Sequence, residues 1–354
     1  MRRVLAVGFA AVAALVLTAC GGDSLTSADG ETVTVSGKFG DAQIPAGADR
    51  VLPLSPQDAD MVIATGVAPI ALPSDANTLV ATGGTGVWPW QADALTEMGY
   101  EVLPPDPGGG IEALTSVEDK EIPTLLFEGD AQGYLEHIVA LEPDVIVATG
   151  QWNLNEEMYR QLSAVAPIVH FDQQANVEPW QDSTRKIGKA LGRESEAESA
   201  IENAEAAVAE VRNAHPEFEG VRFNAVIGDL AGQLYILSGE DRGIGMVMKD
   251  LGFQLSDWAR TVPTDADGRG VVSYELVGNL DTDVAVVISP AGDIDYMRGS
   301  PQWSTMPMVQ RGSIVSIARN AGVPNALGFP SPISLPWGSE RIADALSTAV
   351  SRVP

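Results

Sequence analysis

The chain has 354 residues, with 48 acidic and 21 basic side chains, a formal net charge of −27 and one cysteine. A field this negative repels nucleic acid and anionic membrane surfaces, so neither is expected as a partner. The single cysteine excludes an internal disulfide, and the length suffices for two domains with hydrophobic cores of their own.

The N-terminal segment has the features of an export signal. Residues 1–3 form a short basic start, and residues 4–17 are apolar and uncharged. This apolar run has the length of a signal-peptide core and is shorter than the roughly 20 residues that a membrane-spanning helix needs. Two small residues then precede Cys20, as a processing peptidase requires.

The stretch "LTACG" at residues 17–21 resembles a bacterial lipobox, in which the chain is cut before the cysteine and the thiol is acylated. The resemblance implies a signal peptide at residues 1–19, then a lipidated Cys20 and a flexible tether over residues 20–30. Two or more acyl chains hold a protein stably on a membrane, so we expect a protein anchored at the outer face of the cell membrane. An uncleaved N-terminal anchor with a spare thiol is the alternative interpretation.

Strand and helix patterns alternate along the rest of the chain. "RVLPLS" at residues 50–55 is typical of a short buried strand, and Pro56 and Gly66 are suited to begin and end the helix that follows. Further on, an amphipathic helix precedes a continuous apolar strand at residues 145–148, and the same order recurs near residue 280. The alternation predicts an α/β fold, with open sheets covered by helices on both faces.

The segment at residues 179–216 predicts one long helix. It has no internal proline, is rich in alanine and glutamate, and carries one apolar stripe made of Ile201, Ala204, Val208 and Val211. Gly188 and Gly192 are expected to weaken this helix without breaking it. Its length of roughly 50 Å favours a strut between two lobes. A coiled coil is the alternative, although the stripe lasts only about two heptads.

Four stretches, in order, resemble the substrate-binding lipoproteins of bacterial ferric-siderophore ABC importers, a class that also includes cobalamin and haem binders. They are "IPAGADRVLPLSPQDADMVIATGVAPIAL", "YLEHIVALEPDVIVATG", "WQDSTRKIGKALGRESEAE" and "FPSPISLPWGSERIADAL". The likeness extends over nearly all of the chain after the N-terminal signal.

The resemblance implies two Rossmann-like α/β lobes joined by one long helix, with the ligand cleft between the lobes. We expect the lobes at residues 31–178 and 217–354 and the helix at 179–216. The protein is then expected to capture a ferric siderophore without transforming it, and to deliver it to an ABC permease and its ATPase. On this interpretation it is a monomer with no cofactor, no directly bound metal and no catalytic residue.

The resemblance also implies that one glutamate on each lobe contacts the permease. The pattern "LExIxxLxPDxI" places this role on Glu136, and "SYEL" ahead of "DVAVVI" places it on Glu275. Each lies on a helix just before a buried strand, which predicts that both emerge at the same rim. Without the resemblance, each would be an ordinary solvated carboxylate.

Ligand contacts are expected from aromatic faces, which suit the flat or greasy linkers of siderophores. Trp88 and Trp90 occupy a turn at which relatives carry an aromatic-proline-tryptophan facing the cleft. Trp152 follows the strand at 145–148, at the carboxyl end, where open sheets bind ligands. Partial burial under a loop is the alternative for each tryptophan.

Arginines are concentrated in the second half of the chain, so an anionic chelate would find its counter-charges there. Arg242 is the first candidate because it matches a position after a strand in relatives. Trp258, Tyr296, Arg298 and Arg319 follow as further candidates. A neutral or cationic chelate such as a hydroxamate fits the acidic background equally well.

Other functions find less support in the sequence. A zinc or manganese binder needs several histidines at one site, and the three available lie far apart in the chain. A haem carrier offers an axial histidine or tyrosine, for which His170 is the candidate, although a histidine at a strand end is usually structural. A cell-surface hydrolase would require a motif such as HExxH, GxSxG or SxxK, which the sequence lacks.

Overall fold

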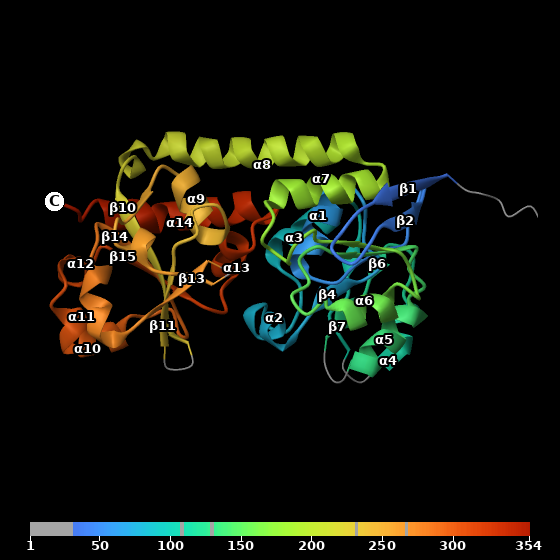
Figure 1. The fold of residues 1–354 in the computed structure, drawn as a ribbon, viewed down its shortest axis with the longest axis horizontal. Helices are drawn as coiled ribbons and strands as arrows, with labels where there is room; N and C mark the ends of the chain where they lie inside the picture. The colour runs from blue at the N-terminus through green and yellow to red at the C-terminus, as the bar shows by residue number, and fades with distance from the viewer. Residues whose placement is uncertain (1–30, 107–109, 128–130, 231–232, 266–267) are drawn as a thin grey trace, which may run out of the picture. The chain divides into compact units, whose positions relative to one another are not determined.

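Apolar strands and amphipathic helices alternate along the chain in a computed structural model, which describes residues 31–106, 110–127, 131–230, 233–265 and 268–354. The result is a mixed α/β fold with two lobes, each built on short parallel strands (Figure 1). The predicted fold class is therefore confirmed. Cys20, the signal segment and the tether lie outside the described residues.

The N-terminal lobe combines an antiparallel hairpin, β1 with β2, a three-stranded parallel sheet in the order β3-β8-β9, and two parallel pairs, β4 with β7 and β5 with β6. Its strands are β1 (Thr32–Val35), β2 (Ala42–Pro45), β3 (Val51–Pro53), β4 (Leu72–Ser74), β5 (Glu101–Val102), β6 (Glu121–Ile122), β7 (Thr124–Leu126), β8 (Val145–Ala148) and β9 (Ile168–His170). Its helices are α1 (Pro56–Ala64), α2 (Ala76–Ala81), α3 (Pro89–Glu97), α4 (Gly110–Thr115), α5 (Ala131–Ala140) and α6 (Glu156–Leu162).

The C-terminal lobe contains a six-stranded sheet in the order β13-β11-β10-β14-β15, with β12 also paired to β10. The pairs β10–β14 and β14–β15 are parallel. Strand β11 is antiparallel to both of its neighbours, β10 and the edge strand β13. The strands are β10 (Arg222–Leu230), β11 (Gln233–Leu237), β12 (Gln254–Leu255), β13 (Arg269–Val272), β14 (Val284–Ser289) and β15 (Ile314–Ala318). The helices are α9 (Gly243–Asp250), α10 (Asp295–Gly299), α11 (Pro301–Ser304), α12 (Pro307–Arg311), α13 (Gly322–Gly328) and α14 (Ser334–Val350), with 3-10 turns η1 (Pro216–Phe218), η2 (Ala259–Thr261) and η3 (Tyr274–Leu280).

Helix α1 forms where the sequence predicts it. Pro56 is its first residue, and the Ser55 hydroxyl accepts a hydrogen bond from the Asp58 backbone N–H, which satisfies one of the free donors of the first turn. Gly66 has a φ of +78° just after the helix, a conformation in which glycine avoids a Cβ clash. The continuous apolar runs at β8 and β14 are fully buried strands, as predicted.

The predicted long helix is wrong in one respect, because the segment folds as two helices, α7 (Trp180–Leu191) and α8 (Glu194–Ala214). Gly192 has a φ of +64° and ends α7, so the chain turns back. Gly188 allows the two helices to pack closely, since a Cβ added there would lie 2.5 Å from the Ala197 Cβ. The two-helix packing therefore overrides the helix propensity of the intervening residues.

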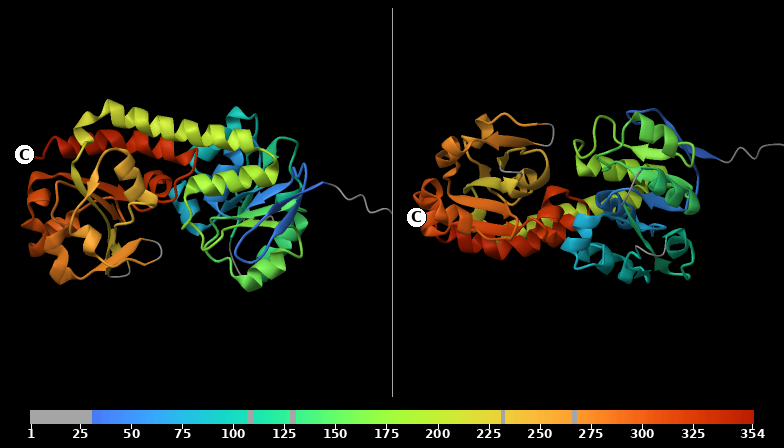
Figure 2. Two further views of the ribbon diagram at one scale, coloured as in Figure 1. Left: turned by 45° about the horizontal axis from the view of Figure 1, so that its top comes forward. Right: turned by 90° about the horizontal axis from the view of Figure 1, so that it is seen from below.

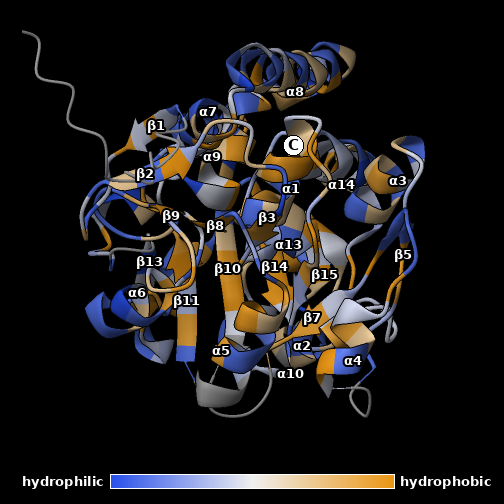
Figure 3. Ribbon diagram, turned by 90° about the vertical axis from the view of Figure 1, so that its right-hand side faces the viewer, coloured by the Kyte–Doolittle hydropathy of each residue, from blue (hydrophilic) through white to orange (hydrophobic). Residues whose placement is uncertain are grey.

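Helix α8 joins the two lobes, because it packs against α1 and α7 on one side and against α9 and α14 on the other (Figures 1 and 2). The predicted stripe is its inner face, in which Ile201, Ala204 and Val208 are buried and Val211 packs against the same core. Figure 3 shows α8 largely hydrophilic in colour and β10 largely hydrophobic. One hydrophobic core cluster runs from β3 and β8 through α8 to β10 and β14, so the two lobes are connected by packed apolar side chains.

Candidate ligand-binding site

Residues from both lobes line a cavity of about 270 Å³. The N-terminal lobe contributes Trp152 and Asn176, and the C-terminal lobe contributes Arg242, Arg319 and Phe329, together with others. Several of these residues follow the carboxyl ends of parallel strands, where open α/β sheets bind ligands. The volume is close to the lower end of the range for small-molecule sites, about 300–1,000 Å³.

Two aromatic rings from different lobes meet at this cavity. Trp152 lies in the loop after β8, and Phe329 directly follows α13. Their ring centroids are 5.9 Å apart with an interplanar angle of 86°, an edge-to-face contact. Trp152 is 46% exposed and Phe329 is 38% exposed, which is high for large apolar residues. Both rings are therefore available to stack on a ligand.

Arg242 and Arg269 approach the cavity with acidic neighbours. The Arg242 guanidinium lies 2.9 Å from the Asp241 carboxylate, and that hydrogen bond lowers the pKa of Asp241. The Arg269 guanidinium lies 3.2 Å from the Asp265 carboxylate. Exposed pairs of this kind are weak, so each guanidinium could exchange its partner for an anionic ligand.

Arg319 differs from these two arginines. Within the described parts of the chain it forms no ion pair, and its Nη2 donates only to the Gly228 carbonyl oxygen at 3.4 Å. Its Nε is buried without a hydrogen-bond partner there, as is the Asn176 Oδ1. A buried donor without a partner is costly, which favours a ligand oxygen at this position. The cavity thus offers one positive charge that no described carboxylate offsets.

A buried carboxylate, Asp58, orders the loop that carries Trp152. Asp58 accepts hydrogen bonds from the Thr149 hydroxyl at 2.7 Å and from the Gly150 backbone N–H at 2.9 Å. The Ser55 hydroxyl donates to the same carboxylate at 2.6 Å. Burial raises the pKa of Asp58, and these hydrogen bonds only partly oppose that effect. The start of the loop is therefore held by buried polar contacts.

A second buried carboxylate, Asp60, links the two lobes. Its oxygens accept hydrogen bonds from the Trp90 indole N–H at 2.9 Å, the Gln91 side chain at 2.7 Å and the Ser331 hydroxyl at 2.7 Å. Burial raises the pKa of Asp60 to about 7, despite these three donors. A second bond between the lobes joins the Gln57 side chain to the Pro330 carbonyl oxygen at 2.8 Å.

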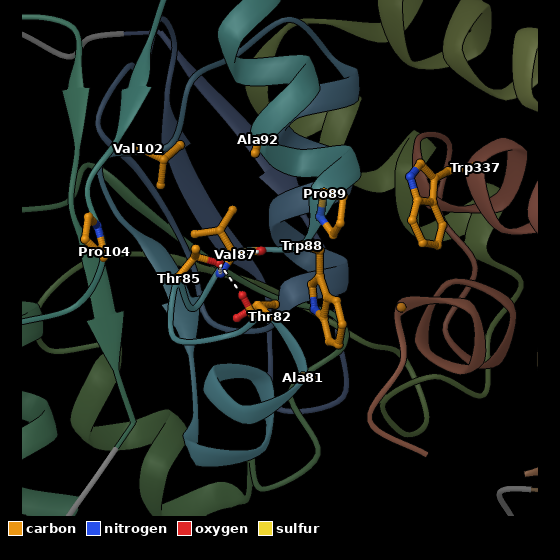
Figure 4. A pocket seen from close by; sticks show the side chains of 11 residues that line it. Ala81, Thr82, Thr85, Val87, Trp88, Pro89, Ala92, Val102, Pro104 and Trp337 are labelled. Atoms are coloured by element: carbon orange, nitrogen blue, oxygen red, sulfur yellow. Dashed lines mark hydrogen bonds between the residues drawn. The ribbon is translucent and has the colours of Figure 1, made fainter. Parts of the chain in front are cut away.

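The structure places Trp90 inside the protein, where it is 5% exposed and stacks on Trp88 with a centroid distance of 5.2 Å. It also contacts the Trp337 ring at 4.9 Å. Trp88 lines a second cavity of about 510 Å³ with Val87, Pro89 and Trp337. Figure 4 shows Trp88 at the start of α3 and Trp337 across from it on α14. This cavity is mostly apolar and contains no arginine among its lining residues.

Two of the remaining candidates, Trp258 and Arg298, do not line either of these two cavities. Trp258 is partly buried and packs against the main core, and Arg298 is exposed and paired with Asp295 at 3.4 Å. Tyr296 lies in α10, and its side chain is outside the described set. Sequence reasoning missed Arg269, Asn176 and Phe329 as cavity residues. Phe329 belongs to the quoted stretch "FPSPISLPWG", which was the available signal.

The two candidate permease contacts are both exposed. Glu136 lies on α5 ahead of β8, and Glu275 lies in η3 ahead of β14, as the sequence predicts. Neither glutamate forms an ion pair with another described residue. Helix α5 carries Glu136, and η3, which carries Glu275, contacts helix α11. Both helices lie along the lower edge of the view in Figure 1, on the side away from α8.

His170, the candidate haem ligand, is 1% exposed, and its ring is fully engaged. Its Nε2 accepts a hydrogen bond from the Phe39 backbone N–H at 2.9 Å, and its Nδ1 lies 3.1 Å from the Ile168 carbonyl oxygen. Burial lowers the pKa of this imidazole. In the described parts of the chain, no three His, Cys, Asp or Glu side chains gather in a way that could hold a metal ion. No helix there is long and apolar enough to span a membrane.

A profile of the periplasmic binding protein family matches residues 67–321. No curated protein matches the chain. Solved structures do match. Streptococcus pneumoniae PiaA in complex with ferrichrome is 21% identical over 91% of this chain and 100% of its own, with a TM-score of 0.73.

Two further structures have similar folds. A periplasmic solute binding protein from Mycobacterium smegmatis is 23% identical over 90% of this chain and 99% of its own, with a TM-score of 0.70. Staphylococcus aureus SirA complexed with staphyloferrin B is 22% identical over 89% of this chain and 98% of its own, with a TM-score of 0.64. At these identities, the matches establish the two-lobed fold.

Proposed function

Because this chain belongs to the periplasmic binding protein family, we propose that it captures a ferric siderophore outside the cytoplasm and delivers it to the permease of an ABC importer. The observation that carries the proposal is the cavity between Trp152, Phe329 and Arg319. It combines two exposed rings with a guanidinium that no described carboxylate neutralises. Aromatic faces suit the linkers of a chelate, and a guanidinium fork suits its oxygen-rich rim.

Several features complete the proposal. Cys20 carries the lipid anchor, residues 31–178 and 217–354 form the lobes, and the protein acts as a monomer on the outer face of the cell membrane. Glu136 and Glu275 contact the permease. Solved proteins of this fold are described with ferrichrome, staphyloferrin B and ferrioxamine B, which supports a ferric chelate as the cargo.

Calorimetric titration of the purified protein tests the cargo. The panel contains ferrichrome, ferrioxamine B, staphyloferrin B and a catecholate chelate, with haemin and vitamin B12 as the competing cargoes. We expect submicromolar binding of at least one ferric chelate. Binding of haemin or vitamin B12 alone would show that the cargo is a macrocycle.

Site variants then locate the binding site. Trp152→Ala and Arg319→Gln should each weaken binding of that chelate about fivefold or more, since loss of a charge-assisted hydrogen bond or a stacked ring costs roughly 1–3 kcal/mol. Arg185→Gln is the matched control, because Arg185 lies on α7 and pairs with Glu198. Equal affinity of all three variants would place the site elsewhere.

The delivery step needs a separate test. The double variant Glu136→Ala and Glu275→Ala should keep its chelate affinity while uptake of the ⁵⁵Fe-labelled chelate into cells is lost. The control pair is Glu202→Ala and Glu210→Ala on the exposed face of α8. Equal loss of chelate affinity and uptake would refute the docking role.

A further inference from the structure

Large apolar side chains that face solvent are concentrated beside the two candidate permease contacts. Eight such side chains are exposed in the described residues, namely Val80, Ile111, Val139, Trp152, Val271, Tyr274, Leu276 and Phe329. Trp152 and Phe329 belong to the cavity. Of the other six, four lie within four residues of Glu136 or Glu275. Exposed large apolar side chains that gather near one another are typical of protein interaction sites.

The C-terminal patch consists of Val271, Tyr274, Glu275 and Leu276. Tyr274 and Leu276 flank the glutamate in η3 and are 51% and 50% exposed. Val271 is 57% exposed and lies on β13, an edge strand of the sheet. In the same turn Val277 is 1% exposed, which fixes η3 against the core. The backbone of this patch is therefore held in place by the core of the lobe.

The N-terminal patch consists of Glu136 and Val139. These residues are three positions apart on α5 and so share one face of the helix. Val139 is 52% exposed, whereas the adjacent Ile138 is fully buried and anchors α5 to the lobe. The same combination of one carboxylate and an exposed apolar side chain thus occurs on each lobe.

Building on the proposed function, we propose that both patches bind the permease through their apolar side chains, while Glu136 and Glu275 set the orientation. The partner surface is the extracytoplasmic face of the permease, with apolar side chains bordered by arginine or lysine. Exposed ion pairs contribute little to affinity because water screens them. Burial of large apolar side chains at an interface contributes most of it.

Charge argues for this partner over a second copy of the chain. The chain has a formal charge of −27, and each patch contains a glutamate without a described ion pair. Two copies would bring like charges together at the interface, which opposes association. A partner with basic groups around an apolar centre is complementary to both patches.

A direct measurement of association between the protein and its permease tests the proposal. The full-length lipidated protein is titrated against its permease–ATPase complex in nanodiscs, without chelate, by biolayer interferometry. Replacing the apolar side chains with Tyr274→Ser and Leu276→Ser should weaken association at least tenfold, and Val139→Ser should weaken it severalfold. Val80→Ser is the matched control, because Val80 is 68% exposed on α2 and lies outside both patches. Its association should be unchanged.

A measurement at high salt distinguishes the contribution of the glutamates from that of the apolar side chains. The loss caused by Glu136→Ala and Glu275→Ala should shrink at 0.5 M NaCl, whereas the loss caused by the serine variants should persist. If the double serine variant loses its thermal transition, the near-isosteric Leu276→Gln replaces it.

Three outcomes would overturn the inference. The double serine variant could associate within twofold of the wild type, Val80→Ser could weaken association as much, or the patches could mediate self-association in analytical ultracentrifugation. Chelate titration of the wild type is read separately. If the wild type binds no ferric chelate, the proposed cargo is refuted. The association measurement would still test whether the two patches bind the permease.

Discussion

The buried Asp60 carboxylate should make the stability of the protein depend on pH. Asp60 is 2% exposed, and burial raises its pKa in the folded state from 3.8 to about 7. In the unfolded chain the same group titrates near 3.8, so between these values the folded protein holds one proton more than the unfolded chain. Stability therefore falls as pH rises through this window.

The size of the effect follows from the shift. A difference of about three pKa units corresponds to about 4 kcal/mol of unfolding free energy, lost between about pH 4 and pH 7.5. Asp60→Asn removes the titrating group and keeps nearly the same volume. The unfolding free energy of the variant minus that of the wild type should therefore rise by about 4 kcal/mol over this range.

Urea unfolding followed by tryptophan fluorescence, at half-unit steps from pH 4 to pH 8, measures the difference. Asp58 also has a raised pKa but is present in both proteins, so its contribution largely cancels. Asp93→Asn is the matched control, because it makes the same substitution at an exposed carboxylate on α3. A difference for Asp60→Asn that stays flat within about 1 kcal/mol would refute the reasoning, because the carboxylate would then remain ionised.

Three further substitutions follow from close contacts and from charge. Gly188→Ala should lower the unfolding free energy by about 1–3 kcal/mol in urea unfolding, because the new Cβ would lie 2.5 Å from the Ala197 Cβ; Gly299→Ala, with open space around it, is the control and should be near neutral. Gly245→Ala should weaken chelate binding as well as stability, since its Cβ would lie 2.1 Å from the Gly239 carbonyl oxygen, in the loop that leads to Arg242; unchanged calorimetric affinity would contradict this. Arg319→Gln should weaken an anionic chelate more than a neutral hydroxamate, and equal loss of both in calorimetry would show that the guanidinium does not act through charge.

The parts of the fold that the sequence predicted are those with a local cause. The runs in β8 and β14 are apolar over four and five consecutive residues, and a short run of this kind bounded by turns favours a buried strand. Helix α1 has its start and end marked by Ser55, Pro56 and Gly66. Such signals act within a few residues, so no tertiary information is needed.

The break at Gly192 could not be predicted from local preference. A glycine inside a helix costs only about 1 kcal/mol, which a long helix tolerates. The turn is stabilised by the packing of α7 on α8, in which Gly188 meets Ala197. Recognition of that contact requires the two helices to be placed side by side, and the sequence spacing alone does not do so.

The site residues divide in the same way. A strand-end position led to Trp152, and the concentration of arginines in the second half of the chain led to Arg319; both line the cavity. Trp90 was proposed for its ring type and its turn, but its indole N–H donates to Asp60, 30 residues earlier in the chain. A tryptophan that faces a cleft and one that bonds a buried carboxylate carry the same sequence signal. Only the tertiary partner distinguishes them.

The contacts between the lobes limit how far the lobes can move. Separation would break the buried Ser331–Asp60 and Gln57–Pro330 hydrogen bonds and open the core cluster beneath α8. Each buried hydrogen-bonding group left without a partner costs roughly 1–3 kcal/mol, and exposed apolar surface adds to that cost. A chelate would have to supply this energy from its own binding. The cavity is therefore best understood as largely formed before the ligand arrives, with its specificity set by Trp152, Phe329 and Arg319 in place.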